Sequence, residues 1–222
     1  MHMSKANRLY ALLLIIFLAG CATFAVGGQF QSGRRALLVG DPETALGYFS
    51  AVAEQNPNYV YQSMHFRENI WTYLGRAQYE TKRYPEARQS LERALTMDRD
   101  DNLARLYLGL THARSGDRSR AIKEIEAGMK GVYDWLEYMN QSRPFEAYWD
   151  PLRQIRNQID KDLATISAKD FNSEELLANA EWLGKKMEEE IDNVRQDERR
   201  QFDRDRDFDR RRGLSFGLGI GF

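Results

Sequence analysis

The sequence repeats itself with a period of 34 residues between Glu68 and Trp135. Shifted by this distance, Leu74-Gly75 falls on Leu108-Gly109, Ala87 on Ala121 and Leu91 on Ile125. A unit of this length, with a small residue after a Leu and an Ala twelve positions later, predicts a pair of antiparallel helices. Small residues allow helix axes to approach to about 8–10 Å, so we expect them at the helix contacts and the larger apolar residues in the core. The repeat therefore predicts an all-α fold.

The copy from Glu68 to Asp101 carries most of a known repeat signature. It reads Trp71-x2-Leu74-Gly75, followed by Tyr79, Ala87, Leu91 and Ala94. This pattern resembles the tetratricopeptide repeat family, although Arg99 stands where the signature closes with Pro. The resemblance implies helical hairpins stacked in a solenoid that binds other proteins, and it does not identify the partner.

A weaker copy precedes this one and begins at Ala25 or Val26. Its signature positions are Gly33, Ala45, Phe49 and Pro57. Because Ala45 and Ala87 are 42 residues apart instead of 34, eight residues near Val60 to Arg67 are inserted. We expect them to lengthen the first helix of the second repeat. The three copies, about the minimum for a stable stack, place the solenoid at residues 29–135.

Residues 136–171 are expected to form capping helices. Val132, Trp135, Leu136 and Met139 have the spacing of an amphipathic helix that ends at Arg143-Pro144, and Asp150-Pro151 has the pattern of an N-cap and first helical residue. The apolar stripe of this second helix is Leu152, Ile155, Ile159, Leu163 and Ile166. Aromatic residues cluster around it: Tyr133, Trp135, Tyr138, Phe145, Tyr148 and Trp149. They indicate a hydrophobic cap on the solenoid or, alternatively, a sugar-stacking or partner site.

Residues 172–212 predict one long helix, because Asn172-x-x-Glu175 resembles a capping box and no Pro follows before Arg212. Its apolar stripe is Leu176, Ala180, Leu183, Met187, Ile191 and Val194. From Arg195 to Arg212 the chain has eight Arg and six acidic residues, with Phe202 and Phe208 as the only apolar ones. This part is either a helix exposed to solvent and supported by pairs three residues apart, or disordered.

The last ten residues, 213–222, change to a period of two. Leu214, Phe216, Leu218, Ile220 and Phe222 alternate with Ser or Gly. This alternation is typical of a strand with one apolar face, and we expect it to dock on a partner's sheet edge. The alternatives are that it lies on a membrane or packs against the chain's own helices.

The amino terminus has the charge asymmetry of an export signal: Lys5 and Arg8 precede an apolar run from Leu9 to Leu18. The run ends in Leu18-Ala19-Gly20-Cys21, which resembles the bacterial lipobox. The resemblance implies a signal peptide at residues 1–20, acylation of Cys21 with chains such as palmitate, and a lipidated tether at residues 21–28. It favours the periplasmic face of the outer membrane, because Ala22 stands where Asp often marks retention in the inner membrane. An ordinary leader with an incidental Cys is the alternative.

The composition narrows the possible functions. The formal net charge is −1, so a nucleic-acid partner is not expected. The single Cys excludes a disulfide framework, and the three histidines show no metal-site spacing with Cys or carboxylates. His112 is expected in the core. We find no phosphate-binding loop and no Gly-x-Ser-x-Gly elbow, so we expect neither a cofactor nor an enzyme.

The family geometry also predicts a binding groove, because the first helix of each repeat lines the concave face. The exposed positions there map onto Arg34, Asn69, Thr72, Arg76, Tyr79, Leu106 and Leu110. Two arginines beside apolar and hydroxyl groups suit an extended or helical peptide with acidic and apolar side chains, such as a segment of an envelope protein. An ordinary solvated face is the alternative.

These features together predict a membrane-anchored adaptor for protein–protein interaction in cell-envelope assembly or secretion. Two alternatives stay open. One is a peptidoglycan-associated enzyme or enzyme activator, and the other is a structural spacer that crosses the periplasm through the helix at 173–212, about 60 Å long.

Overall fold

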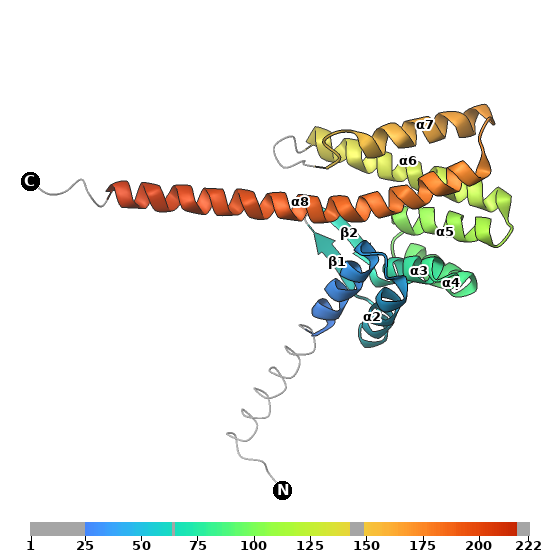
Figure 1. Ribbon diagram of the computed structural model, residues 1–222, viewed down its shortest axis with the longest axis horizontal. Coiled ribbons are helices and arrows are strands. Elements are labelled where there is room, and N and C mark those ends of the chain that lie inside the picture. Colours follow the sequence, from blue (N-terminus) through green and yellow to red (C-terminus); the bar gives the residue numbers. More distant parts are fainter. Residues whose placement is uncertain (1–24, 64, 143–148, 217–222) are drawn as a thin grey trace, which may run out of the picture.

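The described residues form three consecutive helical hairpins, one further helix that packs on the third hairpin, and one long helix (Figure 1). The computed structural model describes residues 25–63, 65–142 and 149–216, with all their side chains except those of 198, 205 and 209–216. The first hairpin joins a helix over residues 25–38 to α2 (Pro42–Gln55). The second joins α3 (Ile70–Glu80) to α4 (Tyr84–Met97), and the third joins α5 (Asn102–Arg114) to α6 (Arg118–Ser142). The all-α class is confirmed.

The small residues of the repeat lie where the two helices of a hairpin touch. A β-carbon added to Gly75 would lie 2.5 Å from Leu91 Cγ, and one added to Gly109 would lie 2.7 Å from the backbone nitrogen of Ile125. The first hairpin repeats the arrangement with Gly33 against the Phe49 ring. In each hairpin the contact spans sixteen residues, which confirms the weak first copy as an equivalent unit.

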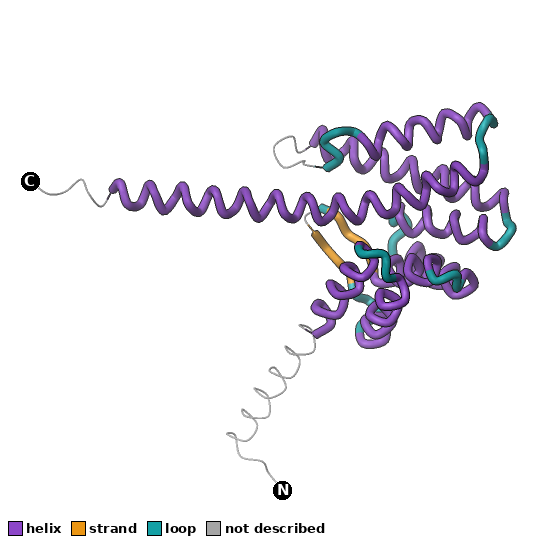
Figure 2. The backbone as a smooth tube through the Cα atoms, in the orientation of Figure 1, coloured by secondary structure: helices purple, strands orange, loops and turns teal. Residues whose placement is uncertain are grey.

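The inserted residues form a β-hairpin between the first and second helical hairpins. Strands β1 (Val60–Ser63) and β2 (Phe66–Asn69) pair antiparallel, with Val60 opposite Asn69 (Figure 2). The expectation that this segment lengthens α3 was wrong. Tyr61 and Ser63 are buried while Val60 and Gln62 are exposed, and this alternation suits a strand that covers the core with one face. Tyr61 stacks on Phe30, with the ring centroids 4.9 Å apart.

The residues expected to form a separate helix near Met139 belong to α6, which runs without a break from Arg118 to Ser142. Val132, Leu136 and Met139 continue its buried face. Trp135 packs edge-on against Trp149, with the ring centroids 4.8 Å apart, and Phe66 contacts both rings. Part of the aromatic cluster is thus a hydrophobic cap, although Tyr138 is exposed and Phe145 and Tyr148 lie outside the described residues.

Helix α7 (Gln154–Ala168) begins three residues later than Pro151, the predicted first helical residue. Asp150 has a left-handed backbone, and its carboxylate accepts hydrogen bonds from the N–H groups of Ile155 and Arg156 at 3.0 and 3.1 Å. It therefore caps the first turn of the helix from outside. Leu152 was expected on the apolar stripe, but it precedes the helix and is exposed.

Helix α8 (Ser173–Phe216) is a single helix of 44 residues, about 66 Å long. The Asn172 side chain accepts from the N–H of Glu174 at 2.9 Å, as a cap should, and the whole stripe from Leu176 to Val194 is buried. The helical alternative for the Arg-rich part is confirmed. The strand expected at 213–222 is wrong for residues 213–216, which continue the helix, and residues 217–222 lie outside the described chain. None of the described helices is long and apolar enough to cross a membrane.

Candidate functional site

The groove predicted on the concave face of the repeats is filled by α8 of the same chain. Figure 1 shows α8 running between the first two hairpins on one side and α6 and α7 on the other. It packs against α5 and α7, and its side chains form ion pairs with residues of the first two hairpins. We call residues 173–194 of α8 the groove segment and residues 195–216 the arm.

All seven residues predicted to line the groove as exposed positions are buried. Each is 0–5% exposed: Arg34, Asn69, Thr72, Arg76, Tyr79, Leu106 and Leu110. Their expected exposure was therefore wrong. Contacts with the groove segment cover Arg34, Arg76 and Tyr79, whereas Asn69 and Thr72 are buried against Asp101. Leu106 and Leu110 belong to the hydrophobic core. Binding of a separate partner by these residues stays a prediction.

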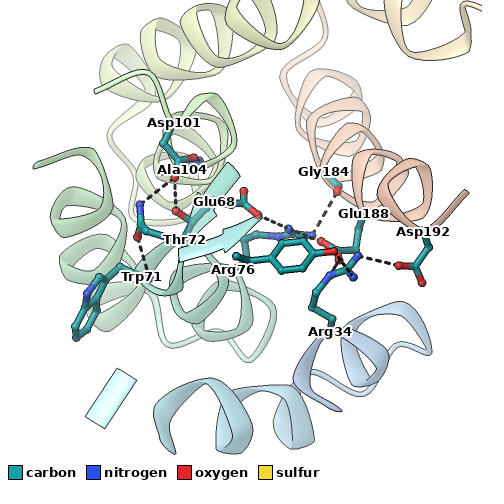
Figure 3. A network of polar contacts seen from close by, with 12 residues as sticks. Arg34, Glu68, Trp71, Thr72, Arg76, Asp101, Ala104, Gly184, Glu188 and Asp192 are labelled. Carbon is teal, nitrogen blue, oxygen red and sulfur yellow. Dashed lines mark hydrogen bonds and ion pairs between the residues drawn. The ribbon is translucent and has the colours of Figure 1, made fainter. Parts of the chain in front are cut away.

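Glu188 of α8 joins the two groove arginines (Figure 3). Arg34 Nε donates to Glu188 Oε1 at 2.5 Å, and Arg76 Nη1 donates to Glu188 Oε2 at 2.8 Å. All three side chains are about 2% exposed. Each carboxylate oxygen thus receives a charge-assisted hydrogen bond from a different repeat, which fixes α8 against both hairpins at one point.

Two further carboxyl groups lie beside these arginines. Asp192 Oδ1 is 3.1 Å from Arg34 Nη2, and Glu68 Oε2 is 3.7 Å from Arg76 Nη1. Burial raises the pKa of Glu68 well above its ordinary range, against the opposing effect of Arg76. Burial thus favours the neutral form of Glu68.

Asn69 and Thr72 have another role, since they bind the N-cap of α5. Asp101 accepts from Thr72 Oγ1 at 2.5 Å, from Asn69 Nδ2 at 3.2 Å and from the Ala104 N–H at 2.8 Å. Burial raises the pKa of Asp101 to about 6. These two predicted groove residues connect the second repeat to the third instead of contacting α8.

Tyr79 contacts α8 at a second point. Its hydroxyl donates to Glu181 Oε1 at 2.5 Å, and Arg114 Nη2 donates to the same oxygen at 3.0 Å. Between these points, Gly184 lies against the Tyr107 ring, where an added β-carbon would be 2.6 Å from Cε2. The absence of a side chain at Gly184 lets the helix approach the groove floor closely.

The three α8 residues Glu181, Gly184 and Glu188 were not predicted as part of a site. A signal was available: the groove was expected to suit a helix with acidic and apolar side chains, and the groove segment has this composition. The sequence pattern did not show that ligand and groove belong to one chain. Helix propensity and an apolar stripe do not specify where a helix docks.

The remaining predicted site residues are described in part or not at all. Cys21, Leu218, Ile220 and Phe222 lie outside the described residues, and Leu214 and Phe216 are described only as helical backbone. Within the described residues, no group of three or more His, Cys, Asp or Glu side chains could hold a metal ion.

Comparison with known families agrees with this architecture. Residues 30–101 and 72–129 match the family model described as Tetratricopeptide repeat. The two stretches overlap and together extend over the three helical hairpins, into α6. No curated protein matches the chain. Proteins of this architecture typically use their concave surface to bind other proteins.

Proposed function

We propose that this chain, whose residues 30–129 match the tetratricopeptide repeat family, is a membrane-anchored adaptor that presents its arm to a partner in cell-envelope assembly or secretion. The observation that carries the proposal is the buried contact of Glu188 with Arg34 and Arg76, because it commits the groove to the chain's own helix. The usual peptide-binding surface of the family is therefore occupied, and α8 leaves it as a projecting arm.

The arm has properties that suit binding. Val194 is the last buried residue of α8 among the described side chains, and Phe202 is 67% exposed. Pairs three residues apart, such as Arg200–Asp197 at 3.5 Å and Arg206–Asp203 at 3.2 Å, support the helix without a core beneath it. The arm is about 33 Å long, so it offers a partner a preformed helix whose ordering is already complete.

The membrane attachment in this proposal depends on Cys21 and its lipobox-like context. Three residues lie between Cys21 and the helix over 25–38, and a fully extended chain from Cys21 to Ala25 spans at most about 14 Å. A lipidated Cys21 would hold the first hairpin close to the bilayer, and two or more acyl chains suffice for stable anchoring.

Fractionation of cells that carry Cys21→Ser tests the anchor. The processed membrane form should disappear and the chain should accumulate in soluble or precursor pools, whereas the neighbouring change Ala22→Ser should leave it in the membrane. A processed Cys21→Ser chain that stays fully in the membrane would contradict the anchor.

Site-specific photo-crosslinking tests the arm. A crosslinker at Phe202 should capture an envelope protein in intact cells, and a crosslinker at Arg88, which is exposed on α4, should not capture the same protein. Equal capture from both positions, or from neither, would count against the arm as the presented surface.

A spacer role is the second candidate, because α8 is one uninterrupted helix of 44 residues. Deletion of residues 199–205 removes two turns and shortens the arm by about 10 Å. If α8 is a spacer, this deletion should reduce function only partly, and insertion of an unrelated helical heptad at the same place should restore it. An adaptor should lose its crosslinked partner if the deleted side chains form the contact.

A further inference from the structure

A polar cavity of about 500 Å³ lies between the helix over residues 25–38 and the base of the arm, a size in the range of ligand sites. The first helix contributes Gln31, Ser32, Arg34, Arg35 and Leu38, and α8 contributes Asp192, Arg195, Gln196 and Arg199. The lining thus contains four arginines and one acidic residue. Arg34 and Asp192 also take part in the groove contacts, whereas Arg35 and Arg199 do not.

The acidic groups nearby do not balance this charge. Glu188 and Asp192 are committed to the buried arginines of the groove. Arg195 reaches Asp192 only at 3.7 Å and donates to Gln31 Oε1 at 3.3 Å. Within the described part of the chain, the side chains of Arg35 and Arg199 make no hydrogen bond or ion pair.

The arrangement keeps like charges together. Arg195 and Arg199 are four residues apart on one helix face, where two cations destabilise a helix by a few tenths of a kcal/mol. Arg34, which is 1% exposed, adds a buried donor: its Nη2 approaches Asp192 Oδ1 at 3.1 Å and still has no hydrogen bond of acceptable geometry among the described residues. A buried donor of this kind is costly to leave unsatisfied.

We propose that this cavity binds a phosphate-bearing anion. Guanidinium groups match phosphate oxygens in pairs of parallel hydrogen bonds, and Arg35 and Arg199 provide two such forks from facing helices. Ser32 and Gln196 line the same space and add neutral hydrogen-bonding groups. The bound anion links the first helix to the base of the arm and reduces the repulsion between Arg195 and Arg199.

The phosphate has two possible sources, a free phosphate compound and the headgroup of an anionic lipid. The cavity itself consists of described residues and does not depend on lipid attachment at Cys21. Failure of anion binding would therefore leave the fractionation result for Cys21→Ser unchanged, so the two proposals can fail separately.

Binding to the full chain, purified in a neutral detergent, distinguishes the sources. The probes are inorganic phosphate, dihexanoyl phosphatidylglycerol below its micelle concentration, and dihexanoyl phosphatidylcholine as the zwitterionic comparison. We expect saturable binding of phosphate or phosphatidylglycerol that weakens as salt is added. Binding of both indicates a general phosphate site, and binding of phosphatidylglycerol alone indicates a lipid headgroup site. Either result supports the proposal.

The double variant Arg35→Gln with Arg199→Gln should weaken binding of the active probe by about tenfold or more, since it removes two charged hydrogen-bonding groups. Arg200→Gln with Arg204→Gln is the control, because it removes the same amount of charge from α8 at positions outside the cavity. Both variants should unfold at the temperature of the unmodified chain, since all four side chains are exposed.

Three results would overturn the proposal. The first is the absence of saturable binding by either phosphate probe. The second is an equal loss of affinity in the two double variants, which would show only a diffuse attraction to the basic arm. The third is binding of a polyglutamate peptide through Arg35 and Arg199 when neither phosphate probe binds, which would assign the cavity to an acidic protein partner.

Discussion

The two halves of α8 have the same backbone and opposite surroundings. The groove segment buries a continuous apolar stripe and the charged side chain of Glu188. The arm has no buried residue among its described side chains and alternates arginines with acids. One helix is thus held by packing at one end and by local side-chain pairs at the other. Helix formation requires only a compatible local sequence, whereas docking requires an apolar face and partners for every buried charge.

The comparison also shows how the position of a charge decides its role. Glu188 and its neighbour Glu189 have the same side chain on the same helix, and Glu188 is buried between two arginines while Glu189 pairs with Lys186 at the surface at 3.0 Å. Loss of a buried partner leaves uncompensated charges, whereas loss of a surface partner has little effect. Four substitutions or deletions test this difference, in order of decreasing effect.

Glu188→Ala should have the largest effect, because it leaves Arg34 and Arg76 buried with less compensation. We expect the free energy of unfolding to fall by about 3–5 kcal/mol, against less than about 0.5 kcal/mol for Glu189→Ala. Urea unfolding followed by circular dichroism measures both. Similar losses for the two variants would mean that α8 is not fixed in the groove by this contact.

The pH dependence of unfolding should distinguish the contact between the second and third repeats from the arm. The pKa of Asp101 is raised to about 6 in the folded protein, so folding favours its protonated form. The contribution of Asp101 to the free energy of unfolding is fully present below pH 3.8, the pKa of the group in the unfolded chain. This contribution is lost as the pH rises to about 6. By linkage the loss amounts to about 3 kcal/mol.

Asp101→Asn should reduce the loss of stability between pH 4 and 7 and leave the part that comes from other buried carboxyl groups such as Glu68. It also lowers stability at every pH by removing acceptors for Asn69 and Thr72. Deletion of residues 199–222 should keep the slope, because it leaves the surroundings of Asp101 intact. Urea unfolding at a series of pH values between 4 and 7 measures it. An unchanged slope in Asp101→Asn would contradict the assignment.

Gly184→Ala should destabilise the protein by about 1–3 kcal/mol, because the added methyl group would press on the buried ring of Tyr107. Gly47→Ala is the control. It lies on the exposed side of α2 with no atom near the added β-carbon, and it should stabilise the chain by about 0.5–1 kcal/mol. The midpoint temperature of thermal unfolding should therefore fall in Gly184→Ala and rise in Gly47→Ala. A shift in the same direction in both variants would argue against close approach at Gly184.

Removal of residues 199–222 should have the smallest effect on the body. No described side chain from Arg199 onward is buried, so the free energy of unfolding should change by less than about 0.5 kcal/mol. Helicity should fall by the contribution of the arm. A substantial loss of stability would show that this part of the chain packs on the body, which was one of the alternatives for residues 213–222.

The repeat architecture was predictable because its signals are local. The small residue of each hairpin, the proline and aspartate at the helix starts, and the stripe of α8 are short-range features of helix packing and capping. Residues 60–69 were less predictable. Their alternation is only four residues long in each strand, and the repeat period favoured a longer helix over a β-hairpin.

The sequence by itself determined that the chain forms helical hairpins with a 34-residue repeat and a long helix after Asn172, because periodicity and capping act within a few turns of the chain. Only the tertiary structure decided that Glu188 forms ion pairs with Arg34 and Arg76. Glu188 is more than a hundred residues away from either arginine along the chain. The local sequence pattern gives each helix an apolar face, but it does not specify against which other helix this face packs. The pairing follows from the shape of the assembled groove and from the cost of burying two arginines without a carboxylate.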